Sequence, residues 1–148
     1  MKNQNSSKLK QRALVLVAFH FLMVVLHSIA HEVLSIKATP VQLAFIILVI
    51  IGAPVVAGLL LLKSERMGAT LLVISMTGSF FFGLYYHFIA HTIDHVAHVA
   101  GLQPAFWTGT FIITAYLLAF SEMLGAFAGF LISKQSQSFK DYAGRTSF

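Results

Sequence analysis

Four long apolar stretches, separated by short polar segments, dominate the sequence. They run from about residue 13 to 34, 41 to 62, 68 to 99 and 107 to 132. Each exceeds the roughly 18 consecutive apolar residues that indicate a membrane span. Because backbone groups in lipid must bond within their own segment, each stretch is predicted to be a helix.

These stretches predict an all-α integral membrane protein, a four-transmembrane-helix bundle. The bundle forms one domain over residues 1–148, with polar tails at residues 1–12 and 134–148. Gly52, Ala53 and Pro54, in the middle of the second stretch, predict a kink or a point of close helix packing.

Composition agrees with the membrane class. Hydrophobic residues make up 57 % of the chain and charged residues 10 %, against about 45–50 % and about 25 % in soluble domains. Soluble and disordered chains are therefore excluded. The chain has no cysteine, which excludes disulfides, thiolate metal sites and iron–sulfur clusters.

The basic residues predict the orientation of the bundle. Of the ten Lys and Arg, Lys37 is the only one on its side of the predicted spans. The other nine share one side, and they are Lys2, Lys8, Lys10, Arg12, Lys63, Arg66, Lys134, Lys140 and Arg145. The positive-inside rule places that side, and both termini, in the cytoplasm. The charge thus marks orientation in the cell membrane, and no nucleic-acid partner is expected.

All seven histidines fall in the first and third stretches. At about 100° per residue, each set forms one narrow helical stripe. The first stripe holds His20, His27 and His31, and the second holds His87, His91, Asp94, His95 and His98. Because ionisable side chains facing lipid are costly, the two stripes are predicted to face each other inside the bundle.

Histidines four residues apart project from adjacent turns of one helix face, a spacing that chelates metal ions. Imidazole suits copper, iron and zinc. The predicted ligands of a transition metal near the outer face are His27, His31, His87, His91, Asp94 and His95. Glu32 and His98 are predicted to be peripheral. His20 and Glu122 have similar depths in the inner half, and they predict a hydrogen-bonded pair, a proton relay or a second weak site.

The histidine spacing resembles that of a known group of membrane enzymes. HxxxH at residues 27–31 and HxxxHxxDHxxH at residues 87–98 are similar to the histidine boxes of membrane di-iron desaturases and hydroxylases. The resemblance is confined to these segments, and those boxes face the cytoplasm whereas these histidines are predicted to face outward. No residue role is therefore taken from it.

The sequence thus predicts a small membrane protein that binds a transition metal for metal handling or redox chemistry. One alternative is an accessory subunit of a larger respiratory or monooxygenase complex. Another is electron transfer through heme b, with His27 and either His87 or His91 as axial ligands. The histidines would otherwise form a proton or hydrogen-bond network. Lipid and either a second copy or other membrane subunits are the expected partners, and catalytic activity is left open.

Overall fold

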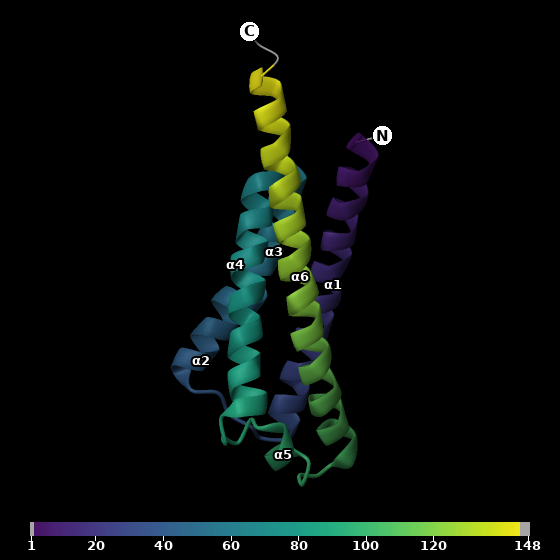
Figure 1. Ribbon diagram of the computed structural model, residues 1–148. Helices are drawn as coiled ribbons and strands as arrows, with labels where there is room; N and C mark the ends of the chain where they lie inside the picture. The colour runs from purple at the N-terminus through teal and green to yellow at the C-terminus, as the bar shows by residue number, and fades with distance from the viewer. Residues whose placement is uncertain (1, 146–148) are drawn as a thin grey trace.

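The computed structural model describes the backbone of residues 2–145 and the side chains of residues 6–136, and this part of the chain is helical with no strand (Figure 1). The elements in order are α1 (Lys2–Val33), α2 (Pro40–Phe45), η1 (Ile46–Gly52), α3 (Ala53–Lys63), α4 (Glu65–Leu84), η2 (Tyr85–Ile89), α5 (Val96–Val99) and α6 (Ala105–Arg145). The two elements labelled η are short π-helical segments.

The elements form four rods, each long and apolar enough to cross a membrane. The candidate spans are Ser6–Val33, Pro40–Lys63, Glu65–Ile89 and Ala105–Ser136. The second combines α2, η1 and α3, and the third combines α4 and η2. The predictions of an all-helical chain and of four helices of spanning length are therefore confirmed.

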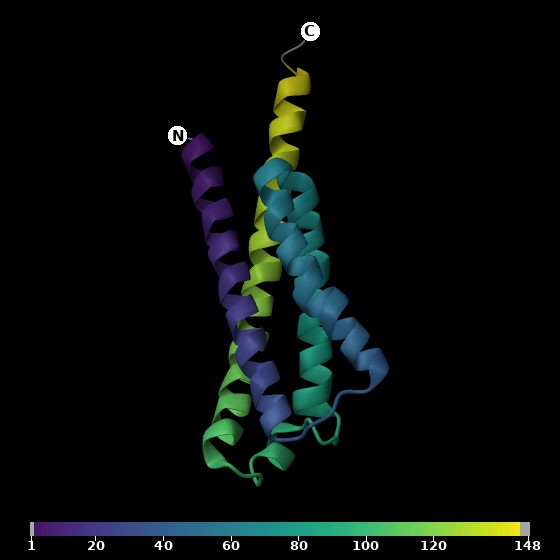
Figure 2. The ribbon, with the colours of Figure 1, turned by 180° about the vertical axis from the view of Figure 1, so that it is seen from behind.

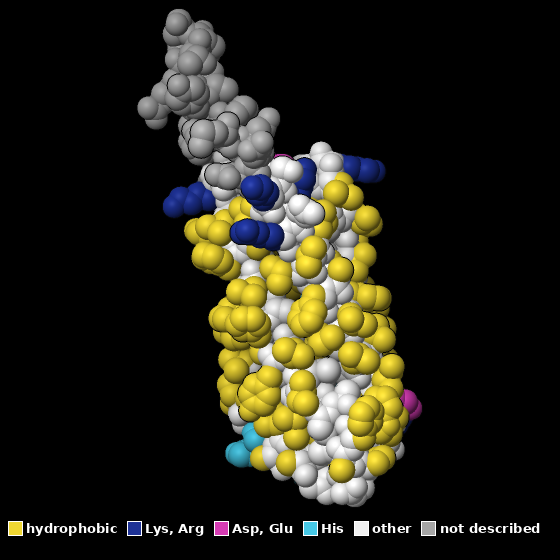
Figure 3. Space-filling model, turned by 90° about the vertical axis from the view of Figure 1, so that its right-hand side faces the viewer, with side chains coloured by type: hydrophobic (Ala, Val, Ile, Leu, Met, Phe, Trp, Pro, Cys, Tyr) yellow, Lys and Arg dark blue, Asp and Glu magenta, His cyan; other side chains and the backbone are white. Residues whose placement is uncertain are grey.

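Consecutive rods are antiparallel, so that the start of α1 and the end of α6 lie at the same end of the bundle (Figures 1 and 2). Helix α6 packs against α1 and α4, and α3 packs against α4. Figure 3 shows Lys and Arg side chains gathered at the end that carries the termini, above a broad hydrophobic belt. We call this the basic end, and the opposite end is formed by the loops at residues 34–39 and 90–104.

Close packing of α4 on α6 depends on glycine. A Cβ added at Gly129 would lie 2.9 Å from Cγ2 of Val73 and 3.0 Å from the backbone oxygen of Ala69. Small residues let membrane helices approach this closely, where dispersion contacts replace the missing hydrophobic drive. A Cβ added at Gly125 would likewise lie 3.0 Å from Cγ of Met76.

The break in the second rod follows from its proline. Pro54 has no backbone N–H and lies at the start of α3, directly after the π-helical segment η1. A π-helical turn accommodates the hydrogen bond that a proline cannot make. The predicted irregularity at Gly52–Pro54 is therefore confirmed, as a π-helical segment that ends at Gly52.

The third rod is shorter than predicted. Its helix ends at Ile89, where Ala90 adopts an extended conformation with φ −76° and ψ 126°. The backbone N–H of Asp94 then bonds Oγ1 of Thr92 at 3.3 Å, and this turn competes with the helix. The prediction of a helix to residue 99 is wrong. In contrast, α1 and α6 continue through the polar segments at residues 2–12 and 134–145.

Candidate metal centre

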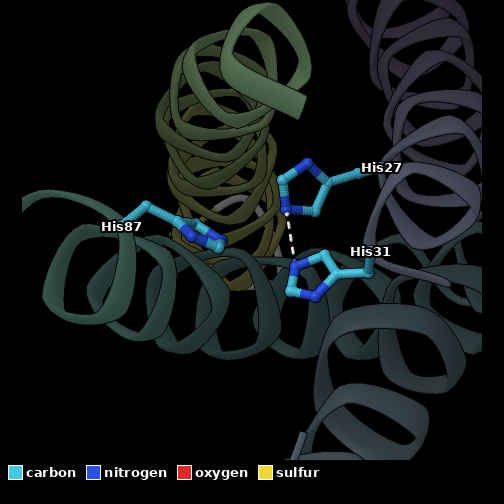
Figure 4. Close-up of side chains that lie close together, drawn as sticks. All are labelled: His27, His31 and His87. Carbon is cyan, nitrogen blue, oxygen red and sulfur yellow. Dashed lines mark hydrogen bonds between the residues drawn. The ribbon is translucent and has the colours of Figure 1, made fainter. Parts of the chain in front are cut away.

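Three histidine side chains converge at the end of the bundle opposite the termini. His27 and His31 lie one turn apart on α1, and His87 lies in η2. One ring nitrogen of each histidine lies within 4.8 Å of the corresponding atoms of the other two. The rings point toward one another (Figure 4), and this group, the histidine triad, is able to hold a metal ion.

A hydrogen bond to α6 fixes the orientation of His27. Its Nδ1 lies 2.8 Å from Oγ1 of Thr114. The single hydroxyl hydrogen of Thr114 is donated to the backbone oxygen of Thr110 at 2.6 Å, a common bond for threonine in a helix. Thr114 Oγ1 therefore accepts from His27, which places the ring hydrogen on Nδ1 and leaves a lone pair on Nε2.

The other two rings are held in the same way by backbone carbonyls. Nδ1 of His31 lies 3.2 Å from the oxygen of Ile36, and Nδ1 of His87 lies 3.0 Å from the backbone oxygen of Asp94. Since a carbonyl oxygen only accepts, both rings carry their hydrogen on Nδ1. Metal-binding histidines are typically oriented by such outer bonds. Each neutral ring of the triad therefore offers Nε2 as its free nitrogen.

With these tautomers, the close contact between His27 and His31 joins two nitrogens that carry no hydrogen. Nε2 of His27 and Nε2 of His31 lie 3.2 Å apart, and two lone pairs facing each other at this distance repel unless a cation lies between them. Two nitrogens bound at about 2.0–2.1 Å to a tetrahedral ion are separated by about 3.3 Å. The spacing fits two ligands of one ion, and it equally fits a hydrogen bond through one shared proton, as the dashed line in Figure 4 draws it.

Phe111 forms the wall behind the triad. It is fully buried, and its ring centroid lies 4.5, 4.9 and 5.3 Å from those of His27, His31 and His87. A phenyl ring in contact with all three imidazoles restricts their rotation and keeps water from that side. The triad is thus closed on the side of Phe111.

A cavity of about 330 Å³ extends from the triad into the bundle. It reaches Glu122 in one direction, and Glu32 and Lys37 in the other. Glu32 and Lys37 form an exposed ion pair at 2.7 Å, so the cavity opens to the surface between α1 and α2. An ion on the triad would have both an approach path and room for a further ligand.

Asp94 lies beside the triad but is not one of the three converging groups. Its side chain is 6 % exposed, lines the cavity, and its Oδ1 has no hydrogen-bond partner in the described part of the chain. Burial raises the pKa of the Asp94 carboxyl, while the neighbouring His87 opposes that rise. The contribution of Asp94 to the triad is the carbonyl that orients His87.

The remaining histidines of the predicted second stripe lie apart from the triad. His91 and His98 are exposed, and His95 is half-buried and accepts a hydrogen bond from the N–H of Ala97 at the start of α5. The ring centroids of His91 and His95 are 5.1 Å apart. The expected single cluster of these residues with the triad is not seen, because the helix that would align them ends at Ile89.

In the middle of the bundle, His20 and Glu122 lie side by side. His20 Nδ1 is 4.0 Å from Oε1 of Glu122 and 3.5 Å from the hydroxyl of Ser121, and both titratable side chains are buried. Nε2 of His20 donates to the backbone oxygen of Ile50 at 3.0 Å. The free lone pair of His20 therefore faces the serine and the carboxyl group.

Sequence reasoning missed the part that α6 plays. Thr114 orients His27, and Phe111 closes the triad, yet neither was a candidate. One signal was present: Thr114 and Ser121 lie seven residues apart, with Glu122 next to Ser121, so α6 has a polar line among apolar residues. A polar line inside a spanning helix marks the face that meets other polar groups.

Fold and site together define an all-helical protein with four helices of membrane-spanning length and a histidine triad of buried and half-buried side chains. No family model matches the chain, and no curated protein or solved structure matches it significantly. The function must therefore be argued from the site itself.

Proposed function

We propose that this chain is an integral membrane protein that binds one transition-metal ion through His27, His31 and His87. The observation that carries the proposal is the facing pair of Nε2 atoms 3.2 Å apart, in rings whose hydrogens are held on Nδ1. A metal cation relieves that repulsion and uses all three free nitrogens. The site would serve metal handling or redox chemistry near the outer face of the membrane.

The donor set favours zinc or copper over iron. Three imidazoles with a fourth position open to solvent or substrate are typical of catalytic zinc sites, and imidazole also suits copper. Non-heme iron commonly takes two histidines and one carboxylate. Here the carboxylate of Asp94 is not part of the converging group, which makes iron the weakest of the three metals.

The outer-face placement of the triad rests on the charges. The described basic side chains other than Lys37 lie at the basic end (Figure 3), and the triad, on the last two turns of α1 and in η2, lies toward the opposite end. With the basic end in the cytoplasm, as the positive-inside rule requires, both termini are cytoplasmic and the triad faces outward. Its role in a homo-oligomer or a larger respiratory or monooxygenase complex is compatible with this orientation and stays a prediction.

A heme between the helices is less well supported. The ring centroids of His27 and His87 are 4.9 Å apart in an edge-to-face arrangement, and Phe111 contacts both rings. A macrocycle would have to enter between rings that are already in contact.

A proton network is the second candidate function, because a shared proton would also relieve the repulsion between Nε2 of His27 and Nε2 of His31. His20 and Glu122 would extend such a network toward the basic end.

Metal content per chain, measured by elemental mass spectrometry on natively purified protein, tests the proposal. We expect about one equivalent of one transition metal in the wild type. The variants His27→Gln and His87→Gln should lose at least nine-tenths of it, roughly the tenfold or greater effect of disturbing a metal site. The matched control is His98→Gln, which changes an exposed histidine and should retain the metal.

A folded wild-type protein without metal, which also takes none up from added zinc or copper, would overturn the proposal and leave the proton network. Equal metal content in His87→Gln and His98→Gln would place the metal elsewhere in the chain.

A further inference from the structure

The cavity beyond the triad carries polar groups that the described part of the chain leaves unsatisfied. Ser79, on α4, is fully buried and its hydroxyl has no hydrogen-bond partner there. By contrast, Ser75, one turn earlier, bonds the backbone oxygen of Leu72 at 3.3 Å. Glu122 also makes no hydrogen bond with described residues, its nearest ionisable partner being His20 at 4.0 Å. Ser79 and Glu122 both line the cavity.

The apolar part of the inner wall comes from all four rods, beside further polar lining residues at Ser28, Gln42 and Asp94. Its side chains are Val24, Ile46, Ile50, Phe82 and Leu118. The volume of about 330 Å³ would hold on the order of ten waters, each of which needs two to four polar partners. The apolar side chains offer no such partners over their part of the wall, and a volume of this size that combines an apolar wall with a few polar groups is typical of ligand pockets.

The mouth of the cavity lies between α1 and α2 and combines apolar and charged side chains. Leu43, on α2, lines the cavity and is half exposed, and Lys37 and Glu32 stand beside it. Helix α2 leans away from α1 at this end of the bundle (Figure 2). A molecule can therefore enter the cavity between α1 and α2.

Gly83 joins the two polar ends of the cavity. A Cβ placed there would lie 3.9 Å from Oε2 of Glu122 and 3.9 Å from Cδ2 of His87. Glu122 and the triad are therefore less than about 8 Å apart across this glycine. A molecule the size of one substituted ring, bonded to Ser79 and Glu122, would also border the triad.

The geometry points to a binding site for an uncharged, lipid-soluble ring compound that carries a carbonyl or hydroxyl oxygen, the chemical class of quinones and phenols. The oxygen function bonds Ser79 and Glu122, and the ring fills the apolar space between α1, η1, α4 and α6. This site goes beyond the proposed metal binding, and it does not require the ion for its polar contacts or its volume.

Equilibrium dialysis in detergent tests this inference, with duroquinone and its reduced form duroquinol as probes and durene, the same ring without oxygen, as the control. We expect saturable binding of about one probe per chain, and weaker binding of durene. Ser79→Ala should weaken binding about two- to tenfold, the effect of one hydrogen bond. Gly83→Leu should abolish it by filling the space, whereas Gly109→Leu, where a Cβ meets nothing within 4 Å, should not change it.

Ala119→Leu fills the same cavity from α6 and replaces Gly83→Leu if that variant fails to fold. Absence of saturable binding, or binding that neither filling variant reduces, would overturn the inference. Each measurement is repeated on protein stripped of metal by a chelator. Probe binding that persists in a chain shown to bind no metal would uphold this site while the proposed function fails, and metal binding without probe binding would do the reverse.

Discussion

Thr114→Val is the sharpest perturbation of the proposed site, because it removes one acceptor and almost no volume. In the wild type, Thr114 Oγ1 accepts the Nδ1–H of His27 at 2.8 Å. Valine keeps the branched shape but has no lone pair, so the ring hydrogen of His27 loses its partner inside the bundle. The ring is then free to move its hydrogen to Nε2, the nitrogen that the metal needs.

The expected magnitude follows from that single bond. Outer hydrogen bonds to metal-binding histidines contribute about 10- to 100-fold in metal affinity, or about 1.4–2.7 kcal/mol. A buried donor left without a partner costs about 1–3 kcal/mol of stability. We therefore expect Thr114→Val to lower the metal affinity by about 10- to 100-fold and the protein to remain folded.

The assay is a competition titration of zinc or copper against a chromophoric chelator, on protein in detergent, with thermal unfolding recorded alongside. Thr110→Val is the matched control, because the hydroxyl of Thr110 bonds only the backbone oxygen of Phe106, at 2.9 Å. If Thr114→Val and Thr110→Val bind metal within about twofold of each other, the tautomer argument for the triad is refuted.

Three further predictions follow from other contacts. Gly129→Leu should separate α4 from α6, since even its Cβ would lie 2.9 Å from Val73. We expect this variant to lower the thermal unfolding temperature by several degrees and Gly109→Leu to leave it unchanged. Equal unfolding temperatures of the two variants would contradict the packing of α4 on α6 through glycine. His20→Gln and Glu122→Gln should keep the wild-type metal content in elemental analysis, because neither residue belongs to the triad. Loss of metal in either variant would show that metal binding at the triad depends on the His20–Glu122 pair. Because the chain has no cysteine, Ala97→Cys should react with a membrane-impermeant maleimide added to intact cells and Arg66→Cys should not; the opposite pattern would reverse the orientation.

The stripe on α1 was predictable because α1 is regular from Lys2 to Val33. A fixed turn of about 100° per residue places His27 and His31 on one face without any knowledge of the neighbouring helices. The similar depth of His20 and Glu122 also followed from sequence, because the rise per residue gives the depth of each residue in a straight helix. Their side chains lie 4.0 Å apart without a hydrogen bond between them, and the predicted relay or second weak site stays a prediction.

The residues of other helices that contact the triad could not be predicted from helical geometry alone. Hydropathy gives the span of α6 but neither its rotation nor its vertical register against α1, so Thr114 and Phe111 remained unassigned. The predicted helix through residue 99 is wrong beyond Ile89 for a different reason, because Thr92 and Asp94 favour a local turn within this apolar segment. Their local hydrogen bond decided against the helix.

The end of that helix at Ile89 is itself a condition for the geometry of the histidine triad. In a continuous helix Asp94 would lie about 10.5 Å further along the axis than His87, and its carbonyl would accept from the helix rather than from a side chain. In the structure the N–H of Ala90 bonds the oxygen of Tyr85, the π-helical segment stops, and the chain turns back. This return brings the carbonyl of Asp94 to 3.0 Å from Nδ1 of His87. The break therefore removes His91 and His95 from the helical stripe and supplies the acceptor that fixes the third ring of the triad.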